Sequence, residues 1–387
     1  ARKKIVKKCV MHGAKREQTA KYIERFSNFF IIPPVDIDPF GILNKIEHLL
    51  DTSEDRFKEA SRQIIRGKDE ELLADVSMSL KGLIGLNQLA KIVRNAVEMA
   101  KKMNNFQLAL IIQMQLPMLE KIARGELEGT KAFLERHPIG DAIGPYVVAS
   151  LTEKRGKEIS EGMVASSGMI AGRKAILVKA TGPGARVGKP GTAVEKLIAK
   201  NKIARVITVD AAAKMEGEKT GTIAEGVGVA MGGAAFKEKA IIEELTMKKG
   251  LPLDAIAVKM GMDEAIRPMV VPVVKAKDDA IKAIEDAANR APKNATLILL
   301  GVGNTVGVGD TKEEIKDVEK IVLKKEKERK AKETKKVWWK RKPAEDMEAD
   351  AGIAPVTRPN LMAYIYAKLT FNPCMRQNSY KYLHRLN

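Results

Sequence analysis

The stretch that decides the fold is Ala204-Arg205-Val206-Ile207-Thr208-Val209-Asp210-Ala211-Ala212-Ala213, a short apolar run that ends in an aspartate and three alanines. Its β-branched residues predict a buried strand. Similar strands and intervening helices are expected on both sides of it, at strands Lys174–Lys179, Ala255–Lys259 and Thr296–Leu300 and helices Thr192–Lys200, Lys237–Lys248 and Ala276–Arg290. This alternation predicts a three-layer α/β domain with a mostly parallel sheet.

The rest of the chain divides around this domain. Residues 1–35 form a basic N-terminal segment, and residues 36–136 show helical periodicity throughout, which predicts a helical domain of four or five helices. The α/β domain is expected over residues 137–311. A charged helix over 312–342 and a C-terminal tail over 343–387 make up a basic C-terminal extension.

The net charge of +19 is concentrated near the two ends of the chain. Residues 1–25 hold nine Lys and Arg against two Glu, and residues 321–342 hold eleven against three, so the two segments carry +15 of that charge. Basic segments of this kind are either solvated or attracted to polyanionic surfaces. The Lys- and Glu-rich composition is typical of thermophilic proteins. With two cysteines in 387 residues, a disulfide framework is excluded and a reducing cytosol is expected.

Two glycine-framed aspartates are the candidate catalytic residues. Asp141 lies in the segment Pro138–Pro145, and Asp210 ends the strand quoted above. Ligands of open α/β sheets bind at the carboxyl ends of strands, so two carboxylates that meet there would share a proton, activate a water or bind a divalent metal. Each aspartate alone is explained equally well as a helix or turn cap.

Further residues are assigned to the same cleft. Glu216 is a candidate third metal ligand beside Asp141 and Asp210. The other cleft residues lie in glycine-rich turns that follow strands, and they are Gly140, Gly144, Gly184, Gly188, Gly191, Glu218, Thr220, Gly301, Gly303 and Asn304. The loop over residues 182–192 lacks the spacing of a phosphate-binding loop, and the third glycine of the turn at 301–307 is one place late for a dinucleotide fingerprint.

Two resemblances add to these patterns. The segment from Ile32 to about Asp310 resembles an uncharacterised archaeal family, often with an N-terminal membrane anchor, in Asp36–Pro39, Glu47–Asp51, Gln113–Pro117, Pro138–Pro145 and Asp210–Gly221. The α/β core resembles the spore germination protease and the hydrogenase maturation endopeptidases, through the helix start at Asp141–Val148, the turn at Pro183–Gly191 and the strand end at Val206–Ala213. The second resemblance implies that Asp141 and Asp210 occupy the places of the acidic residues of those peptidases.

The order of the motifs differs from that of the peptidases. Their Gly-x-Gly-Asn strand precedes the first acidic loop, whereas Gly301-Val302-Gly303-Asn304 comes at the far end of this domain. A circular permutation is therefore expected, with strand Thr296–Leu300 beside Arg205–Val209 or Lys174–Lys179 and with Asn304 near Asp141. The peptidases also use a histidine metal ligand, and this chain has no histidine between His137 and His384.

Two functions from different classes are compatible with these observations. The first is a peptidase-like hydrolase that acts on a protein or peptide through Asp141 and Asp210, with or without a divalent metal. The second is a non-catalytic protein that binds ribosomal RNA or an anionic membrane surface through its basic segments, with contacts from Lys335, Lys336, Trp338, Trp339, Lys340, Arg341 and Lys342. The expected location is the cytoplasm, either free or attached to the inner face of the membrane by an anchor upstream of Ala1.

Overall fold

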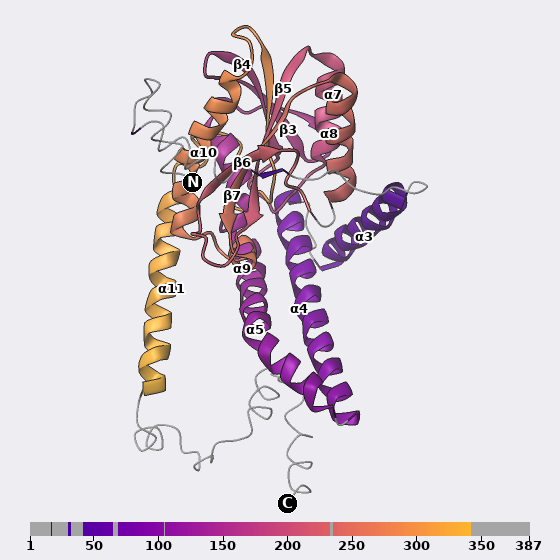
Figure 1. The fold of residues 1–387 in the computed structure, drawn as a ribbon, viewed down its shortest axis with the longest axis vertical. Coiled ribbons are helices and arrows are strands. Elements are labelled where there is room, and N and C mark those ends of the chain that lie inside the picture. Colours follow the sequence, from indigo (N-terminus) through magenta and orange to yellow (C-terminus); the bar gives the residue numbers. More distant parts are fainter. Residues whose placement is uncertain are drawn as a thin grey trace, which may run out of the picture.

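The computed structural model describes Glu17 and residues 30–31, 42–64, 69–103, 105–232 and 235–341. An α/β domain of three layers carries a long helical hairpin that projects away from it (Figure 1). The predicted fold class, an N-terminal helical region followed by an α/β domain with a mostly parallel sheet, is confirmed.

The sheet has eight strands in the order β1-β6-β7-β5-β8-β4-β3-β2. In its centre the neighbouring pairs β7–β5, β5–β8 and β8–β4 are parallel. The pairs β6–β7, β4–β3 and β3–β2 are antiparallel. The strands are β1 (Phe30–Ile31), β2 (Lys157–Ser160), β3 (Met163–Ile170), β4 (Arg173–Ala180), β5 (Ile203–Ala213), β6 (Ile223–Val227), β7 (Leu253–Met260) and β8 (Thr296–Gly301).

The expected position of β8 is confirmed, since this last strand lies between β5 and β4 and pairs with both. Strands β1, β2, β3 and β6 were not predicted. In β3 the sequence Met163-Val-Ala-Ser-Ser-Gly-Met-Ile170 contains no continuous apolar run, because this strand lies second from the edge of the sheet, between β2 and β4, and is partly exposed. Hydrophobic periodicity therefore identified the buried parallel centre of the sheet and missed its half-solvated edges.

Helices cover both faces of the sheet. On one face, α6 (Ile143–Ser150) and α10 (Val271–Asn289) pack into a core with β5, β7 and β8. On the other, α7 (Pro190–Lys200) and α8 (Phe236–Lys249) pack with β4, β5 and β8. Buried alanines at 276, 280, 283 and 287 recur at helical spacing on α10, and their small side chains let this helix lie close to the sheet. The short helices η1 (Gly140–Ala142) and α9 (Met262–Ile266) complete the domain.

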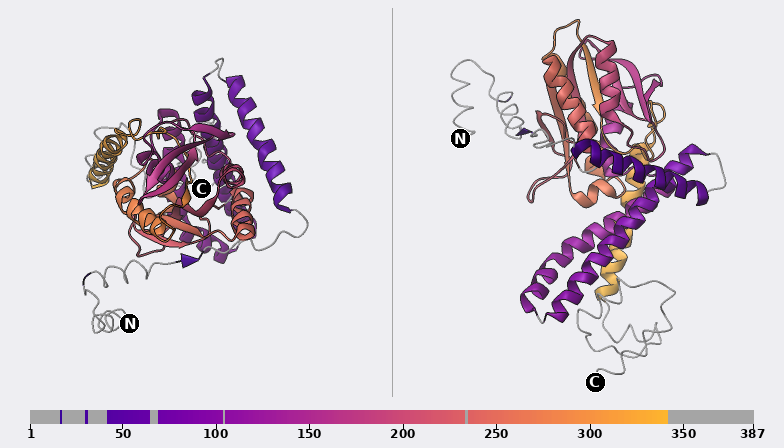
Figure 2. Two further views of the ribbon diagram at one scale, coloured as in Figure 1. Left: turned by 90° about the horizontal axis from the view of Figure 1, so that it is seen from above. Right: turned by 90° about the vertical axis from the view of Figure 1, so that its right-hand side faces the viewer.

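The part of the helical region that the structure describes consists of three helices, not the four or five expected. They are α3 (Ile42–Ile64), α4 (Glu70–Lys102) and α5 (Phe106–Glu135). The number differs because α4 and α5 are long and Pro117 does not interrupt α5. The carboxylate of Asp69 and the amide oxygen of Asn105 accept backbone N–H groups at the starts of α4 and α5. Figure 2 shows the two helices side by side, extending well beyond the sheet.

The charged helix begins later than expected. Helix α11 spans Val318–Arg341, not 312–342, because the backbone N–H of Lys312 donates to the carbonyl of Thr152 and residues 312–317 form turns. Val318 and Val322 are buried, so the first turns of α11 belong to the core of the α/β domain.

Candidate functional site

Asp141 is held at the end of the sheet by the segment that enters α6. Ile139 forms an isolated β-bridge with Pro268, and the N–H of Gly140 donates to the carbonyl of Arg267 at 3.1 Å. The chain then turns through η1, which carries Asp141, and continues as the buried helix α6. Backbone hydrogen bonds therefore fix the position of this loop without any contribution from the side chains of the site.

Asp210 lies on β5 at the level where the neighbouring strand ends. Val209 is in register with Gly301, the last residue of β8, and Asp210 is the next residue of β5. The N–H of Val302 donates to the carbonyl of Val209 at 2.9 Å, which holds the turn after β8 against β5. Asp210 is 6% exposed, so its carboxyl is largely removed from water.

Three of the predicted glycines permit the close approach that brings the two aspartates together. A Cβ atom on Gly144 would lie 2.1 Å from the carbonyl oxygen of Val302, and one on Gly303 would lie 2.0 Å from the carbonyl oxygen of Asp141. Gly303 also has a φ of +130°, which side chains strongly disfavour. A Cβ on Gly301 would lie 2.6 Å from the carbonyl oxygen of Gly144. These positions require glycine because backbone packs directly on backbone.

The two carboxyl groups interact electrostatically. Burial raises the pKa of Asp141, against the effect of a 2.7 Å hydrogen bond that the N–H of Asn304 donates to its Oδ2 atom. Burial and, second, the charge of Asp141 raise the pKa of Asp210 well above its ordinary range. The N–H of Ala211 donates to Asp210 Oδ1 at 2.7 Å and opposes this rise. The expected proximity of Asn304 to Asp141 is thus confirmed.

Each carboxyl group has one oxygen without a hydrogen-bond donor in the part of the chain that the structure describes. These atoms are Asp141 Oδ1 and Asp210 Oδ2. Asp141 as a residue keeps part of its surface exposed, whereas Asp210 is buried. These two oxygens are the ones that remain available for proton transfer.

The acidic loop after β5 does not join this pair. Glu216 is exposed, and the Glu218 side chain accepts the N–H of Met215 and lies 3.7 Å from Lys259 Nζ. Among the described residues, no three His, Cys, Asp or Glu side chains are placed to hold a metal ion. The three candidate ligands Asp141, Asp210 and Glu216 are therefore not brought together, because Glu216 is exposed and Glu218 bonds within its own loop.

Thr220 and Gly140, two of the predicted cleft residues, contact helix α9. The hydroxyl of Thr220 donates to Glu264 Oε2 at 2.6 Å, and the N–H of Gly261 donates to the same oxygen at 2.8 Å. A Cβ atom on Gly140 would lie 2.1 Å from the carbonyl oxygen of Glu264. Both residues therefore support η1 through α9.

The glycines of the 182–192 loop serve packing elsewhere. A Cβ atom on Gly184 would lie 2.3 Å from Glu71 Oε2 on α4, one on Gly188 would lie 2.3 Å from the sulfur of Met163, and one on Gly191 would lie 2.4 Å from the carbonyl oxygen of Glu238. Their assignment to the acidic cleft has no support from these contacts. They join the loop to α4, β3 and α8.

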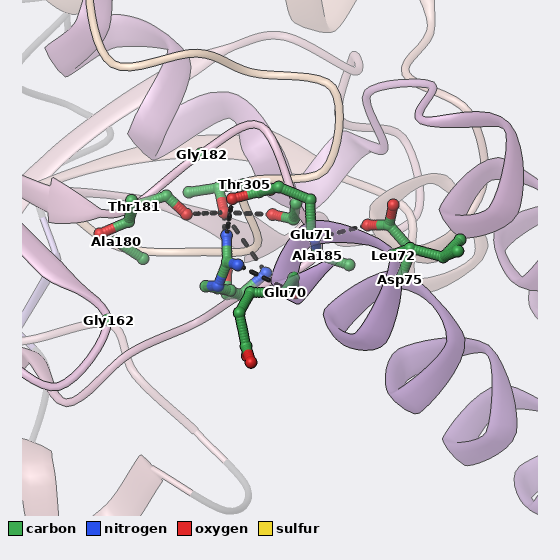
Figure 3. Close-up of polar contacts among 12 residues, drawn as sticks. Glu70, Glu71, Leu72, Asp75, Gly162, Ala180, Thr181, Gly182, Ala185 and Thr305 are labelled. Carbon is green, nitrogen blue, oxygen red and sulfur yellow. Dashed lines mark hydrogen bonds and ion pairs between the residues drawn. The ribbon is translucent and has the colours of Figure 1, made fainter. Parts of the chain in front are cut away.

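Sequence reasoning missed the junction between this loop and the helical region, which Figure 3 shows. Asp75 of α4 is 1% exposed and accepts the N–H of Ala185 at 2.9 Å and Arg136 Nε at 2.6 Å. Arg186 Nη1 donates to Glu71 Oε1 at 2.7 Å. The local sequence did not single out Asp75, because the buried residues near it on α4 include Ser77, Ser79 and Gly82, and it gives no information on the distant partners of this aspartate.

A second missed group lies at the end of β4. Lys179 is 2% exposed, and its Nζ atom donates to Asp310 Oδ1 at 2.6 Å, while the N–H of Gly182 donates to the same oxygen at 2.9 Å. Burial lowers the pKa of Lys179, and the Asp310 carboxylate opposes this effect. A lysine at the end of an apolar strand is a sequence signal that would have drawn attention to Lys179, although not to its partner Asp310, which lies 131 positions away.

The basic stretch near the C-terminus is described only in its backbone. Residues 335–341, with Lys335, Lys336, Trp338, Trp339, Lys340 and Arg341, continue helix α11, and Lys342 lies outside the described residues. Within the described part of the chain, every helix is too short or too polar to span a membrane.

Comparison with known proteins gives a family. Residues 1–136 match "Protein of unknown function (DUF1512) N-terminal domain", and residues 139–309 match "Domain of unknown function (DUF1512) C-terminal". No curated protein and no solved structure matches significantly. The two matched segments meet at the point where α5 ends and the loop to Asp141 begins, and together they span most of the chain. The chain therefore belongs to the DUF1512 family.

Proposed function

We propose that this protein is a hydrolase, most simply a peptidase, in which Asp141 and Asp210 share one proton and activate a water molecule. The observation that carries the proposal is that each aspartate has a raised pKa and that the charge of Asp141 contributes to the rise at Asp210. Two carboxyl groups in this relation hold a single proton over a wide pH range. One group is then a base and the other an acid at the same pH.

The electrostatics suggest which group has which role. Each carboxyl group accepts one backbone N–H at 2.7 Å, so the hydrogen bonds do not distinguish them, but the charge of Asp141 adds to the effect of burial and raises the pKa of Asp210 well above its ordinary range, which assigns the shared proton to Asp210. Asp141 would take a proton from water as the water oxygen bonds to the substrate carbonyl carbon. Asp210 would protonate the carbonyl oxygen. The carbon–nitrogen bond then breaks, the amine leaves with the proton held by Asp141, and Asp210 recovers its proton from the hydroxyl of the intermediate.

A peptide substrate is supported by the resemblance of the Asp141 and Asp210 segments to two peptidase families. The position of β8 between β5 and β4, with Asn304 bonded to Asp141, fits the permuted arrangement expected from that resemblance. The pair of aspartates also lies at the carboxyl ends of the central parallel strands, where sheets of this class place their ligand sites.

The test is cleavage of an unstructured protein substrate, such as casein, and of a peptide library by the purified full chain. Asp141→Asn and Asp210→Asn should each reduce the rate by about 10²–10⁴-fold, the usual contribution of general acid–base catalysis. Glu216→Gln is the matched control, because this carboxylate is exposed and outside the pair. Activity that survives both aspartate substitutions, or that is lost equally in Glu216→Gln, would contradict the assignment.

The pH profile gives an independent readout. Activity requires one ionised and one protonated carboxyl group, so it should rise as the first group ionises and fall as the second loses its proton. Because both pKa values are raised, the rising limb should lie above the ordinary aspartate pKa of 3.8. A rate that is already maximal below that pH would argue against a shared proton.

A binding function through the basic segments is the second candidate, supported by the concentration of charge in residues 1–25 and 321–342. Binding to ribosomes or to anionic vesicles should then weaken steeply with salt. Deletion of residues 321–342 is unsuitable as a test, since Val322 belongs to the core. Replacing Lys335, Lys336, Lys340 and Arg341 with Gln leaves the core intact, and unchanged binding by that variant would exclude these side chains as contacts.

A further inference from the structure

Strand β5 is longer than its neighbour β8 at the end that carries the two aspartates. Val209 pairs with Gly301, the last residue of β8, whereas the next four residues of β5 continue beside β7 and pair with Ala257–Met260. In the described part of the chain, these four residues have no strand beside them on the side of β8. Residues Asp210–Ala213 are called the β5 overhang below.

The backbone groups of alternate residues of the overhang face this open side. The N–H groups of Val206 and Lys214 both donate to backbone carbonyls on the side of β7, and the carbonyl of Val209 accepts a hydrogen bond from the side of β8. Successive residues of a strand direct their N–H and C=O groups to opposite neighbours, so even-numbered residues of β5 bond to β7. Ala211 and Ala213 therefore direct their backbone groups toward the open side.

Three of these four backbone groups have no partner among the described residues. The N–H of Ala211 donates to Asp210 Oδ1 at 2.7 Å, which leaves the C=O of Ala211 and both groups of Ala213. The loop that follows β5 begins and ends against β7, where the N–H of Gly221 donates to the carbonyl of Lys259 at 2.8 Å. Ala213 is exposed and Ala211 is partly exposed. The overhang is thus a short, unpaired sheet edge.

The buried carboxyl group of Asp210 lies at the start of this edge. Its Oδ1 atom accepts the N–H of Ala211, which faces the open side. Its Oδ2 atom has no donor among the described residues, although Asp210 is only 6% exposed. Asp141 lies where β8 has ended, bonded to the N–H of Asn304. A molecule that binds along the overhang therefore meets both aspartates at the end of β8.

The free groups of the overhang match the backbone of an extended peptide. An unpaired strand edge is a template on which a peptide adds as a further strand, through main-chain hydrogen bonds. The overhang offers one N–H donor and two carbonyl acceptors, and its alanine side chains are small. We propose that the substrate is an unfolded peptide segment whose backbone binds to the β5 overhang as a short strand in line with β8. This inference rests on the proposed peptidase function, because it states how that substrate is held.

The end of β8 determines where the bound strand stops. The N–H of Val302, directly after β8, bonds to the carbonyl of Val209, so the chain of the protein itself occupies the line of the new strand at that level. The peptide must turn away there, beside Asp141 and Asp210. The cleaved bond therefore adjoins the last peptide residue that pairs with the overhang, and recognition of the backbone lies on one side of that bond.

The first experiment uses the full chain and the best-cleaved peptide of the library. The peptide is resynthesised with a methyl group on one backbone nitrogen at a time, at every position except the cleaved bond. Methylation at two positions, two residues apart and on one side of that bond, should raise KM at least fivefold, because the carbonyls of Ala211 and Ala213 each lose a donor. All other positions should change KM less than twofold. Equal effects at adjacent positions, or no effect at any position, would overturn the proposal.

The second experiment follows hydrogen exchange in the full chain with Asp141→Asn, labelled with ¹⁵N-alanine, so that added peptides stay intact. The N–H of Ala213 should exchange rapidly in the chain alone and more than tenfold more slowly when the peptide library is added. The N–H of Ala212, which faces β7, is the control and should be protected in both conditions. The signal of Ala213 is assigned by its loss in Ala213→Pro, which removes no bond to β7. With Asp141 intact, Ala213→Pro should raise KM at least fivefold and keep the urea midpoint of the wild type.

Failure of this proposal and failure of the proposed function give different results. Cleavage without protection of the Ala213 N–H would overturn binding at the overhang and leave the role of the acid pair standing. Protection without cleavage would support binding at the overhang and contradict the hydrolase. Neither cleavage nor protection would overturn both. Protection in the chain alone would show that another part of the chain or a second copy covers the overhang, and it would overturn the proposal.

Discussion

Substitution of Gly144 by alanine tests how the site is assembled. The new Cβ atom would lie 2.1 Å from the carbonyl oxygen of Val302 and 2.5 Å from that of Val209, both on the backbone of the sheet end. Side-chain carbons rarely approach other atoms within 3.4 Å, so the start of α6 must retreat by about 1 Å or more from the ends of β5 and β8. Asp141 is three residues earlier, on η1, which leads directly into α6, and it would move away from Asn304.

The cost follows from these two effects. Forcing one extra carbon into a packed site costs about 1–3 kcal/mol. Losing the hydrogen bond from the Asn304 N–H to the Asp141 carboxylate adds on the order of 1–2 kcal/mol, after allowance for its partial exposure. A destabilisation of about 3 kcal/mol is therefore expected, a large part of the free energy of unfolding of a typical domain.

Urea denaturation at neutral pH, followed by circular dichroism, measures this change. Gly232→Ala is the control, since a Cβ atom there meets no atom within 4 Å, and its free energy of unfolding should differ from that of the wild type by less than about 0.5 kcal/mol. The reasoning is refuted if Gly144→Ala unfolds at the same urea concentration and with the same slope as Gly232→Ala.

Two further substitutions probe other parts of the account. Asp75→Asn should destabilise the protein by about 1–3 kcal/mol in the same urea assay, because an amide NH2 in place of one carboxylate oxygen cannot accept from Arg136 Nε or the Ala185 N–H and leaves one of these donors without its acceptor, although burial raises the pKa of Asp75; an unchanged midpoint would show that this junction contributes little. Asp210→Asn should be more stable than the wild type at neutral pH and similar to it at pH 3. The folded pKa of Asp210 is raised, so the native state favours the protonated carboxyl, and this stability is present at low pH and lost as the pH rises through that pKa. A variant less stable than the wild type at both pH values would contradict this sign.

Sequence patterns predicted the centre of the fold because buried parallel strands are continuous apolar runs. Thr296–Leu300 was recognised as a strand on that basis, and the resemblance to the peptidases led to the expectation that it lies beside Arg205–Val209 or Lys174–Lys179; it pairs with both β5 and β4. Strand β3 (Met163–Ile170), second from the edge of the sheet, has Ser166, Ser167 and Gly168 in its middle, so its periodicity is weak. Edges are held by pairing with a neighbour more than by burial, and pairing leaves little trace in one sequence.

The candidate site was also predictable only in part. Asp141 lies between Gly140 and Gly144, Asp210 follows the apolar run of β5, and the rule for strand ends predicts that they meet. Glu216 was misplaced because proximity in sequence to Asp210 does not fix the direction of a loop. The junction of Asp75 with Arg136 joins residues 61 positions apart, and no local pattern predicts such a contact.

The central claim is that Asp141 and Asp210 share one proton, and titration of the two carboxyl carbons by NMR tests it most directly. With ¹³C-labelled aspartate, the two signals should be assigned by their loss in Asp141→Asn and in Asp210→Asn. The account predicts two separate transitions, both above the ordinary aspartate pKa of 3.8, with Asp210 the higher, and a lower pKa for Asp210 once Asp141 is replaced by Asn. Two independent transitions at or below 3.8, unchanged by substitution of the other aspartate, would contradict it.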